Sequence, residues 1–489
     1  MMPLPPGKTL FGQPRGLATL FFTEMWERFS YYGMRAILTL FMVTAAADGG
    51  LGVADATASS IFGLYVAGSY LTSLLGGWVA DRLLGAQRAV ITGAVFIMVG
   101  NALLASGSTQ VFFIGLVVAA FGVGFLKPNV SALIAPLYPE GGSRRDAGFS
   151  LFYMGINVGA LFGAMLVPIC AARFGWHWGF ALPAAGMLLG LVQFLFTRHY
   201  LAGPARGAPI TRSPRAWLPV IVIAAAVVLT VTLAATGRLS IDARVVARLA
   251  SWAIGFVAVG YFTYLIFFAG LSPTERQRVY VMLALFIAAT VYYAGQEQAG
   301  TSLTLFADRY TDRHIFGWNM PAGMLQGISS LYILIFAPLF SALWIALGRR
   351  GKDPSTPVKF AIGLALMGAG FLVMFVACRY VLAGQKVAPT WLIVCYLIQM
   401  WGDLCLAPVG LSSMTKLAAP RFVGQVMGMF FLSVALGNNL AGQLASEYVA
   451  SDLPSLPALF LKIFGWGAIA AAIMLVSTPW LKRHMVGVK

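Results

Sequence analysis

Seven ionisable side chains lie inside long apolar stretches of this sequence, where a charge is costly. A charged group at the centre of a bilayer costs about 2.5–3.5 kcal/mol on insertion scales, so seven groups facing lipid would cost on the order of 20 kcal/mol. We therefore expect them to face one another or a water-filled cavity. Four are acids and three are bases, so one added proton would neutralise the set, which suggests a site that cycles one proton. They are Glu24, Glu27, Arg28, Arg35, Lys127, Glu297 and Asp403.

The first apolar stretch carries most of these groups on one helical face. At 100° per residue, its polar side chains fall within about 100° of arc, with Tyr32 just beside them. The sequence therefore predicts a polar stripe that faces the interior of a helix bundle. A structural Glu–Arg cluster that locks helices together is the alternative, although a stripe of three turns is more than locking requires. The stripe comprises Glu24, Glu27, Arg28, Tyr31 and Arg35.

The motifs of common enzyme and nucleotide sites are missing from the sequence. The glycine-rich run 122–127 is not followed by the GK[ST] of a phosphate-binding loop, and neither HExxH nor GxSxG occurs. The four histidines fall in loops or at helix ends, and we interpret the four cysteines as small buried hydrophobes. We expect no enzyme activity, no metal and no cofactor. Uphill transport would then draw on an ion gradient, with the proton as the coupling ion.

The composition requires that membrane helices position these groups. Of 489 residues, 59% are hydrophobic and only 10% are charged, against about 25% charged in soluble chains. The net charge of +17 reflects cationic cytoplasmic loops rather than nucleic-acid binding. A span needs about 20 apolar residues, and this criterion predicts an all-α protein with fourteen spans: 17–43, 57–80, 89–107, 110–134, 148–171, 179–197, 216–236, 248–270, 279–306, 322–347, 358–379, 390–415, 423–447 and 457–481.

Loop charges predict the orientation of these spans. An even number of spans places both termini on one side, and Lys and Arg are concentrated in the termini and loops of that side, which predicts that both termini are cytoplasmic. The outward segment 238–248 is a local exception. Clear examples of inward charges are Arg144, Arg145, Arg349, Lys359 and Lys482, which leaves Lys127 as the only lysine that we place inside a span.

The spans divide into six, two and six. A polar stretch rich in Gly, Pro and Arg at 200–215 ends the first six, and the next two spans carry almost no intramembrane charge. Two six-span halves around a central site are the plan of major facilitator transporters. We therefore expect an N-terminal six-helix bundle over 1–200, a linker with two inserted helices over 201–275, and a C-terminal six-helix bundle over 276–489.

At this point a family resemblance is visible. The segment 24–33, Glu-Met-Trp-Glu-Arg-Phe-Ser-Tyr-Tyr-Gly, resembles the ExxERFxYYG motif of the proton-dependent oligopeptide transporters of the major facilitator superfamily. Bacterial members also have two extra helices between the halves, as at 216–270. Further segments that resemble family or superfamily motifs are 77–85, 152–159, 295–300 and 402–411.

The resemblance implies a role for each matching residue. Arg35 and Lys127 would hold the terminal carboxylate of a peptide, an acid in the other half would meet its amino terminus, and Asn157 would bind its backbone. The implied substrate-binding residues are Tyr31, Tyr32, Arg35, Tyr70, Lys127, Asn157, Tyr293, Ser329 and Asp403. The implied proton-coupling residues are Glu24, Glu27, Arg28 and Glu297, and the implied conformational latch is formed by Asp81 and Arg82.

Several of these residues also admit simpler structural roles. Tyr31 and Tyr32 would serve as interfacial aromatics, Asn157 as a helix–helix hydrogen-bonding residue, and Tyr292 as a packing residue. The sequence also departs from the family pattern at three positions. The family's tenth helix usually has Glu where this chain has Asp403, Gln296 stands where a second acid is often found, and Ser329 replaces the usual Asn.

The sequence thus predicts a proton-coupled symporter that imports di- and tripeptides across the cytoplasmic membrane by alternating access. The expected partners are peptides, protons and the lipid bilayer, with no nucleic acid, and we expect the monomer to be functional. One alternative is a transporter of the same family for a non-peptide substrate, such as an anion or a peptide-like drug. A membrane enzyme or a non-transporting sensor is the other alternative, and the missing catalytic motifs speak against the enzyme.

Overall fold

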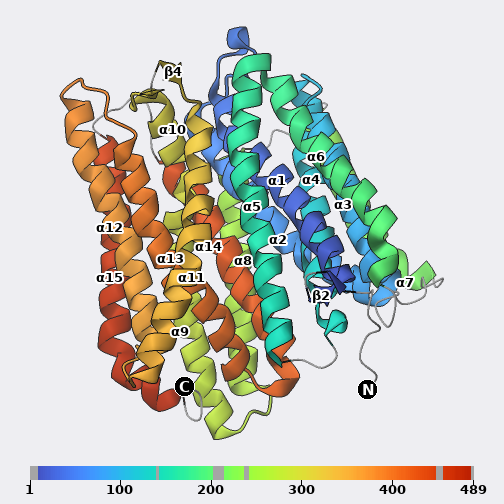
Figure 1. Cartoon of the computed structure of the whole chain (residues 1–489), viewed down its shortest axis with the longest axis vertical. Coiled ribbons are helices and arrows are strands. Elements are labelled where there is room, and N and C mark those ends of the chain that lie inside the picture. Colours follow the sequence, from blue (N-terminus) through green and yellow to red (C-terminus); the bar gives the residue numbers. More distant parts are fainter. Residues whose placement is uncertain are drawn as a thin grey trace. The chain divides into compact units, whose positions relative to one another are not determined.

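A computed structural model of the chain describes residues 9–10, 12–138, 142–201, 214–235, 242–315, 317–447 and 455–485 (Figure 1). These residues form long α-helices, with two short antiparallel strand pairs. The chain divides into two compact units. Unit 1 comprises Met1–Phe41, Ala47–Leu51 and Gly68–Ile241, and unit 2 comprises Met42–Ala46, Gly52–Ala67 and Asp242–Lys489.

Unit 1 contains the N-terminal helices. Its α3 lies against α4 and α6, and α5 lies against α6. The first half of α2 belongs to unit 2 and the second half to unit 1. The helices are α1 (Arg15–Val43), α2 (Asp55–Val79), α3 (Ala86–Leu104), α4 (Thr109–Ala132), α5 (Gly142–Phe174), α6 (Trp176–Thr197) and α7 (Pro214–Ala235). Shorter elements are β1 (Thr9–Leu10), β2 (Gln13–Pro14), η1 (Ala46–Asp48), the π-helical turn η2 (Ala80–Leu84), η3 (Ala135–Leu137) and η4 (Arg198–Leu201).

Small residues let the helices of unit 1 approach one another closely. A Cβ atom at Gly163 of α5 would overlap the carbonyl oxygen of Phe29 in α1, and one at Gly76 of α2 would overlap that of Gly124 in α4. Apolar side chains gain nothing from leaving lipid for a helix interface, so close van der Waals contact has to supply the attraction. These contacts place the polar face of α1 inside unit 1.

Unit 2 contains the C-terminal helices. Its α12 lies against α13 and α15, and α14 lies against α8 and α9. The helices are α8 (Ala243–Phe267), α9 (Pro273–Gln296), α10 (Ser302–Arg309), α11 (Gly327–Arg349), α12 (Thr356–Leu382), α13 (Thr390–Leu417), α14 (Val423–Ser446) and α15 (Ser455–His484). Shorter elements are η5 (Glu297–Gly300), β3 (His314–Ile315), β4 (Trp318–Asn319), η6 (Ala322–Gln326) and η7 (Pro420–Phe422).

Local sequence explains where these helices begin. Ser272 accepts a hydrogen bond from the backbone N–H of Glu275, the Glu275 side chain accepts one from the backbone N–H of Ser272, and Pro273 opens α9. This capping box satisfies two free N–H groups of the first turn. Between α5 and α6, Gly175 has a φ of 92°, which favours glycine and lets the chain reverse with no longer loop.

The fold class is confirmed as a helical membrane protein. Twelve helices of the described residues are long and apolar enough to cross a membrane. The set omits α1, whose 29 residues are long enough but include five charged side chains, and α7, several of whose side chains are not described. Each of the fourteen expected spans coincides with a helix, except that the ninth is divided into α9, η5 and α10. Most of the polar stretch 200–215 and part of the outward segment 238–248 lie outside the described residues, as do the side chains of Arg144 and Arg145.

Candidate functional site

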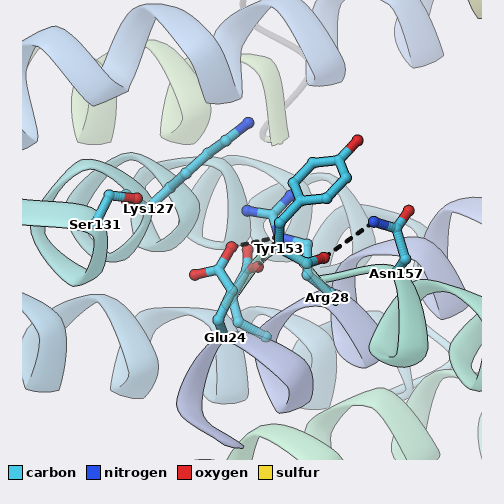
Figure 2. A network of polar contacts seen from close by, with 7 residues as sticks. Glu24, Arg28, Lys127, Ser131, Tyr153 and Asn157 are labelled. Atoms are coloured by element: carbon cyan, nitrogen blue, oxygen red, sulfur yellow. Dashed lines mark hydrogen bonds and ion pairs between the residues drawn. The ribbon is translucent and has the colours of Figure 1, made fainter. Parts of the chain in front are cut away.

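The polar stripe of α1 forms an ion cluster buried in unit 1. The Nε atom of Arg28 lies 2.9 Å from Oε1 of Glu24 and 2.6 Å from Oε2 of Glu27 (Figure 2). All three side chains are at most 4% exposed. One guanidinium therefore serves two carboxylates. Among the described residues, Glu24 Oε2, Glu27 Oε1 and Arg28 Nη2 have no hydrogen-bond partner, and the ion pair with Arg28 is the contact of Glu27 Oε2.

Aromatic rings line the rest of this stripe. The Arg28 guanidinium lies 5.5 Å from the centroid of the Tyr31 ring, and that of Arg35 lies 5.7 Å from the Tyr32 ring. The two tyrosine rings pack edge to face at 5.3 Å. Tyr31 and Arg35 are buried, and Tyr32 is half-buried. Because rings and guanidinium groups alternate, each cation contacts an aromatic face that attracts it.

Lys127 comes to this cluster from α4, directly before Pro128. Its ammonium nitrogen lies 3.9 Å from the centroid of the Tyr70 ring of α2. Among the described residues, no carboxylate lies within the 4.0 Å of an ion pair with this nitrogen, although Glu24, Glu27 and Arg28 lie within electrostatic range. Figure 2 shows the extended Lys127 side chain beside the Glu24–Arg28 pair. The nearest charges of opposite sign to the ammonium are therefore carboxylates farther away than an ion pair, and its direct contact is the Tyr70 ring.

Asn157 lies on α5, in the same unit. Its amide nitrogen donates to the carbonyl oxygen of Tyr153 at 3.0 Å, one turn earlier on the same helix (Figure 2). The side chain is 4% exposed. Within the described part of the chain, this hydrogen bond of the amide stays in its own helix, whereas the alternative role from the sequence needs a bond between helices.

A second cluster of acids lies in unit 2. Asp403 of α13 is buried, the side chains of Gln296 and Tyr292 approach its carboxylate, and Glu297 lies within electrostatic range. Tyr292 is fully buried and donates its hydroxyl hydrogen bond to the carbonyl oxygen of Gln399 at 3.0 Å. Tyr292 is therefore more than a packing residue. Gln296, noted from the sequence only as a departure, is here a neighbour of Asp403.

The remaining predicted residues of unit 2 have less defined surroundings. Tyr293 packs edge to face on Tyr292 at 5.5 Å. Ser329 lies in the first turn of α11 and is half-buried. The interpretation of Lys127 as the only lysine inside a span is wrong, because Lys462 lies within α15 and Lys359 lies within α12, where it is 9% exposed. Its ammonium pairs with Asp353 at 2.8 Å and lies 4.5 Å from the Trp344 ring.

The sequence did not predict the break between α9 and α10, in the helix that is the seventh of the family scheme, which leaves the two inserted helices out of the count. The α-helix stops at Gln296, four residues follow in 3₁₀ geometry, and α10 resumes at Ser302. Glu297, the predicted coupling acid, is the first residue of this break and is half-buried. A mid-helix 3₁₀ stretch often marks a functional hinge. The signal that the sequence offers here is the pair of glycines at 295 and 300, and glycines in a membrane helix indicate close helix contact as readily as a break.

Two charged features lie near helix ends. Asp81 and Arg82, the predicted latch, are exposed in the π-helical turn that ends α2 at Gly85, where φ is 79°.

An ion pair that the sequence did not predict joins Asp55, the first residue of α2, to Arg309, the last residue of α10. It is bidentate, with nitrogen–oxygen distances of 2.6 and 2.7 Å. Both residues belong to unit 2.

These features define the class of protein. Long apolar helices surround buried acids, cations and tyrosines in each unit, which is typical of secondary transporters. Within the described residues, no group of His, Cys, Asp and Glu side chains is arranged to hold a metal ion. The profile of the POT family matches residues 87–459. The chain belongs to this family of transporters, and it is a membrane transporter rather than an enzyme.

Known proteins resemble the chain over almost its whole length. The peptide transporter YePEPT of Yersinia enterocolitica is 39% identical, covering 98% of this chain and 97% of its own. A di-/tripeptide transporter of Lactococcus lactis is 35% identical, covering 97% of each chain. The crystal structure of a peptide transporter POT, a Glu→Gln mutant in complex with alafosfalin, is 38% identical with a TM-score of 0.90, covering 99% of this chain and 98% of its own.

Proposed function

We propose that this transporter imports di- and tripeptides with protons across the cytoplasmic membrane by alternating access. The observation that carries the proposal is the state of Lys127, whose ammonium contacts the Tyr70 ring and has no carboxylate within 4.0 Å among the described residues. A cation held in that way is available to a carboxylate that arrives with a substrate. Every peptide has a terminal carboxylate, and the relatives with 39% and 35% identity are named as peptide and di-/tripeptide transporters.

Both ends of a peptide then have partners of opposite charge. Lys127 and Arg35 of unit 1 would bind the carboxylate, with Arg35 suited to a bidentate grip and Lys127 acting as a point charge. Asp403 and Glu297 of unit 2 are acids that would attract the amino terminus. Because the two termini are common to all peptides, recognition by these groups predicts broad tolerance of side chains. Tyr31, Tyr32, Tyr70, Asn157, Tyr293 and Ser329 would complete the contacts to the peptide.

Proton coupling is assigned to the buried acids. In unit 1, Arg28 serves both Glu24 and Glu27, so one carboxylate charge of the triad is not locally neutralised. In unit 2, Glu297 and Asp403 place two acids within electrostatic range. Acids inside a membrane protein commonly form the proton relays of transporters. Glu24, Glu27, Arg28 and Glu297 would therefore link proton binding to transport, with Asp81 and Arg82 acting as a latch.

The proposed transporter works as a monomer, needs no cofactor besides the transported proton, and has both termini in the cytoplasm. The charge asymmetry of the loops supports this orientation. The same proposal divides the chain into an N-terminal six-helix bundle (1–200), a linker with two inserted helices (201–275) and a C-terminal six-helix bundle (276–489).

Uptake into liposomes containing the purified protein tests this function. With an inward proton gradient, labelled dialanine should accumulate above its external concentration, and a protonophore should abolish the accumulation. Unlabelled di- and tripeptides should compete, while single amino acids should not. Proton-driven uptake of another solute that dialanine fails to inhibit would indicate a non-peptide substrate. No uptake of any solute by a well-folded preparation would instead favour a sensor.

A further inference from the structure

The neighbour of Glu297 holds the break in the seventh helix. Gln298 is fully buried, and its amide group makes four contacts. Its nitrogen donates to the carbonyl oxygens of Ala441 in α14, at 3.0 Å, and of Ala294 in α9, at 3.3 Å. Its oxygen accepts from the hydroxyls of Ser302, at 2.6 Å, and Thr301, at 3.3 Å. One side chain therefore ties together the helix before the break, the helix after it and a neighbouring helix.

The break changes the helical hydrogen bonds around it, and side chains contact two of the backbone carbonyls beside it. In a continuous helix the carbonyl of Ala294 would accept from the N–H of residue 298, and here the side chain of Gln298 also reaches it. Thr304 does the same for Ala299, donating at 2.6 Å while accepting from Gln326 at 2.8 Å. An unpaired backbone carbonyl in lipid costs several kcal/mol. The break is therefore a built feature of unit 2 and is supported by side chains on both sides.

Close packing also fixes the two ends of the break. A Cβ atom at Gly295 would overlap the sulfur of Met367 in α12, and one at Gly300 would overlap the ring of Phe62 in α2. With Ala441 of α14, three helices contact the segment. Gln298 points into this packing, while the adjacent Glu297 is half-buried. A 3₁₀-helix has 3.0 residues per turn and an α-helix 3.6, so making the segment regular would turn Glu297 relative to α10.

We infer that Gln298 is a positioning residue for proton coupling, which fixes the direction of the Glu297 carboxylate by holding the 3₁₀ break against α14. The inference rests on the proposed role of Glu297. In this role Gln298 acts through Glu297, because the contacts of its amide are to Ala294, Ser302, Thr301 and Ala441. Its amide sets the geometry in which Glu297 meets the peptide and the proton.

Replacement of Gln298 by Leu tests this inference, because Leu keeps much of the volume and removes all four contacts. The readouts are proton-driven accumulation of labelled dialanine and counterflow, the exchange of peptide with no proton gradient. Accumulation should fall about tenfold, the factor that corresponds to one buried hydrogen bond left unmade, and counterflow should stay within about twofold of wild type. Gln399→Leu is the matched control, since Gln399 is similarly buried in unit 2 and its amide nitrogen has no hydrogen-bond partner among the described residues.

A double variant with Glu297→Gln completes the experiment. Once Glu297 cannot exchange a proton, Gln298→Leu should cause no further loss of accumulation. The inference would be overturned if Gln298→Leu lost counterflow and accumulation equally, or if it accumulated dialanine as wild type does. The role of Glu297 would still hold in either case, provided that Glu297→Gln alone fails to accumulate dialanine. Wild-type accumulation by Glu297→Gln would overturn both. Ser302→Ala removes the 2.6 Å contact alone, and it should give a smaller loss of the same kind if Gln298→Leu does not fold.

Discussion

The ammonium nitrogen of Lys127 lies 3.9 Å from the centroid of the Tyr70 ring. A cation over an aromatic face is stabilised by about 2 kcal/mol or more when water is excluded, which is less than a paired carboxylate provides. Tyr70 therefore holds the charge in place without neutralising it. A substrate carboxylate can therefore form an ion pair with the Lys127 ammonium without first displacing a carboxylate of the protein.

Lys127→Ala should abolish proton-driven dipeptide uptake, because it removes the cation proposed to bind the carboxylate. We expect a loss of at least about tenfold, the factor that corresponds to 1.4 kcal/mol of binding free energy. Uptake in proteoliposomes measures this. Lys462→Ala is a suitable control, since Lys462 is exposed on α15 and pairs with Glu447. Accumulation at the wild-type rate by Lys127→Ala would show that this lysine does not bind the substrate.

Glu297→Gln should uncouple transport from the proton gradient while peptide exchange continues. Gln copies the shape of the protonated acid and cannot release a proton. The variant should exchange labelled for unlabelled dialanine across the membrane, yet fail to concentrate it. If the variant concentrates dialanine as wild type does, Glu297 is not the coupling acid, and Glu24 and Glu27 are the next candidates.

Asp403→Glu should retain uptake, and Asp403→Ala should lose most of it. Glu is the acid that the family usually has at this position, so Asp403→Glu restores it. Ala removes the buried carboxylate that the side chains of Gln296 and Tyr292 approach. The initial rate of dialanine uptake at several concentrations separates a change in KM from a change in kcat. Similar, wild-type-like rates in both variants would mean that Asp403 does not act on the substrate or the proton.

Arg28→Leu should strongly destabilise the protein, because it leaves Glu24 and Glu27 buried without their shared cation. Breaking a buried ion pair costs about 3–5 kcal/mol, and thermal unfolding in detergent should show the lower stability. Arg244→Leu is the matched control, since its 3.4 Å pair with Asp242 is exposed and should leave Tm unchanged. A Tm for Arg28→Leu equal to that of the control would argue against the buried cluster.

Charge reversal tests the bidentate pair between Asp55 and Arg309. Each single reversal, Asp55→Arg or Arg309→Asp, places like charges together and should lower stability by about 1–3 kcal/mol. The double variant restores opposite charges and should recover more than half of the loss in Tm. Additive losses in the double variant would show that the two side chains do not interact in solution.

The sequence predicted helix faces better than it predicted contacts. The grouping of Glu24, Glu27 and Arg28 followed from helical periodicity, because residues three and four apart share a face whatever the partner helices are. Their geometry matches that expectation, with one arginine between two acids. By contrast, the partner of Lys127 is a ring from another helix, and no local rule specifies such a contact.

The features that the sequence missed depend on tertiary packing. Nothing in the spacing around Glu297 ends a helix there, because the stop depends on Gln298 reaching α14 and Thr304 reaching Ala299. Lys359 was assigned to a loop because it stands at the edge of an apolar run. The structure buries it, since Asp353 and the Trp344 ring receive its ammonium.

The overlap that any side chain at position 300 would make with Phe62 is also a constraint on sequence variation. A homologue that carries Ala at position 300 has to make room, most simply by a smaller residue at position 62. Substitutions at these two positions should therefore be correlated among family members, with their combined side-chain volume nearly constant. Such covariation would link the second and seventh helices of the family scheme across more than 200 intervening residues, although neither residue is charged or titratable.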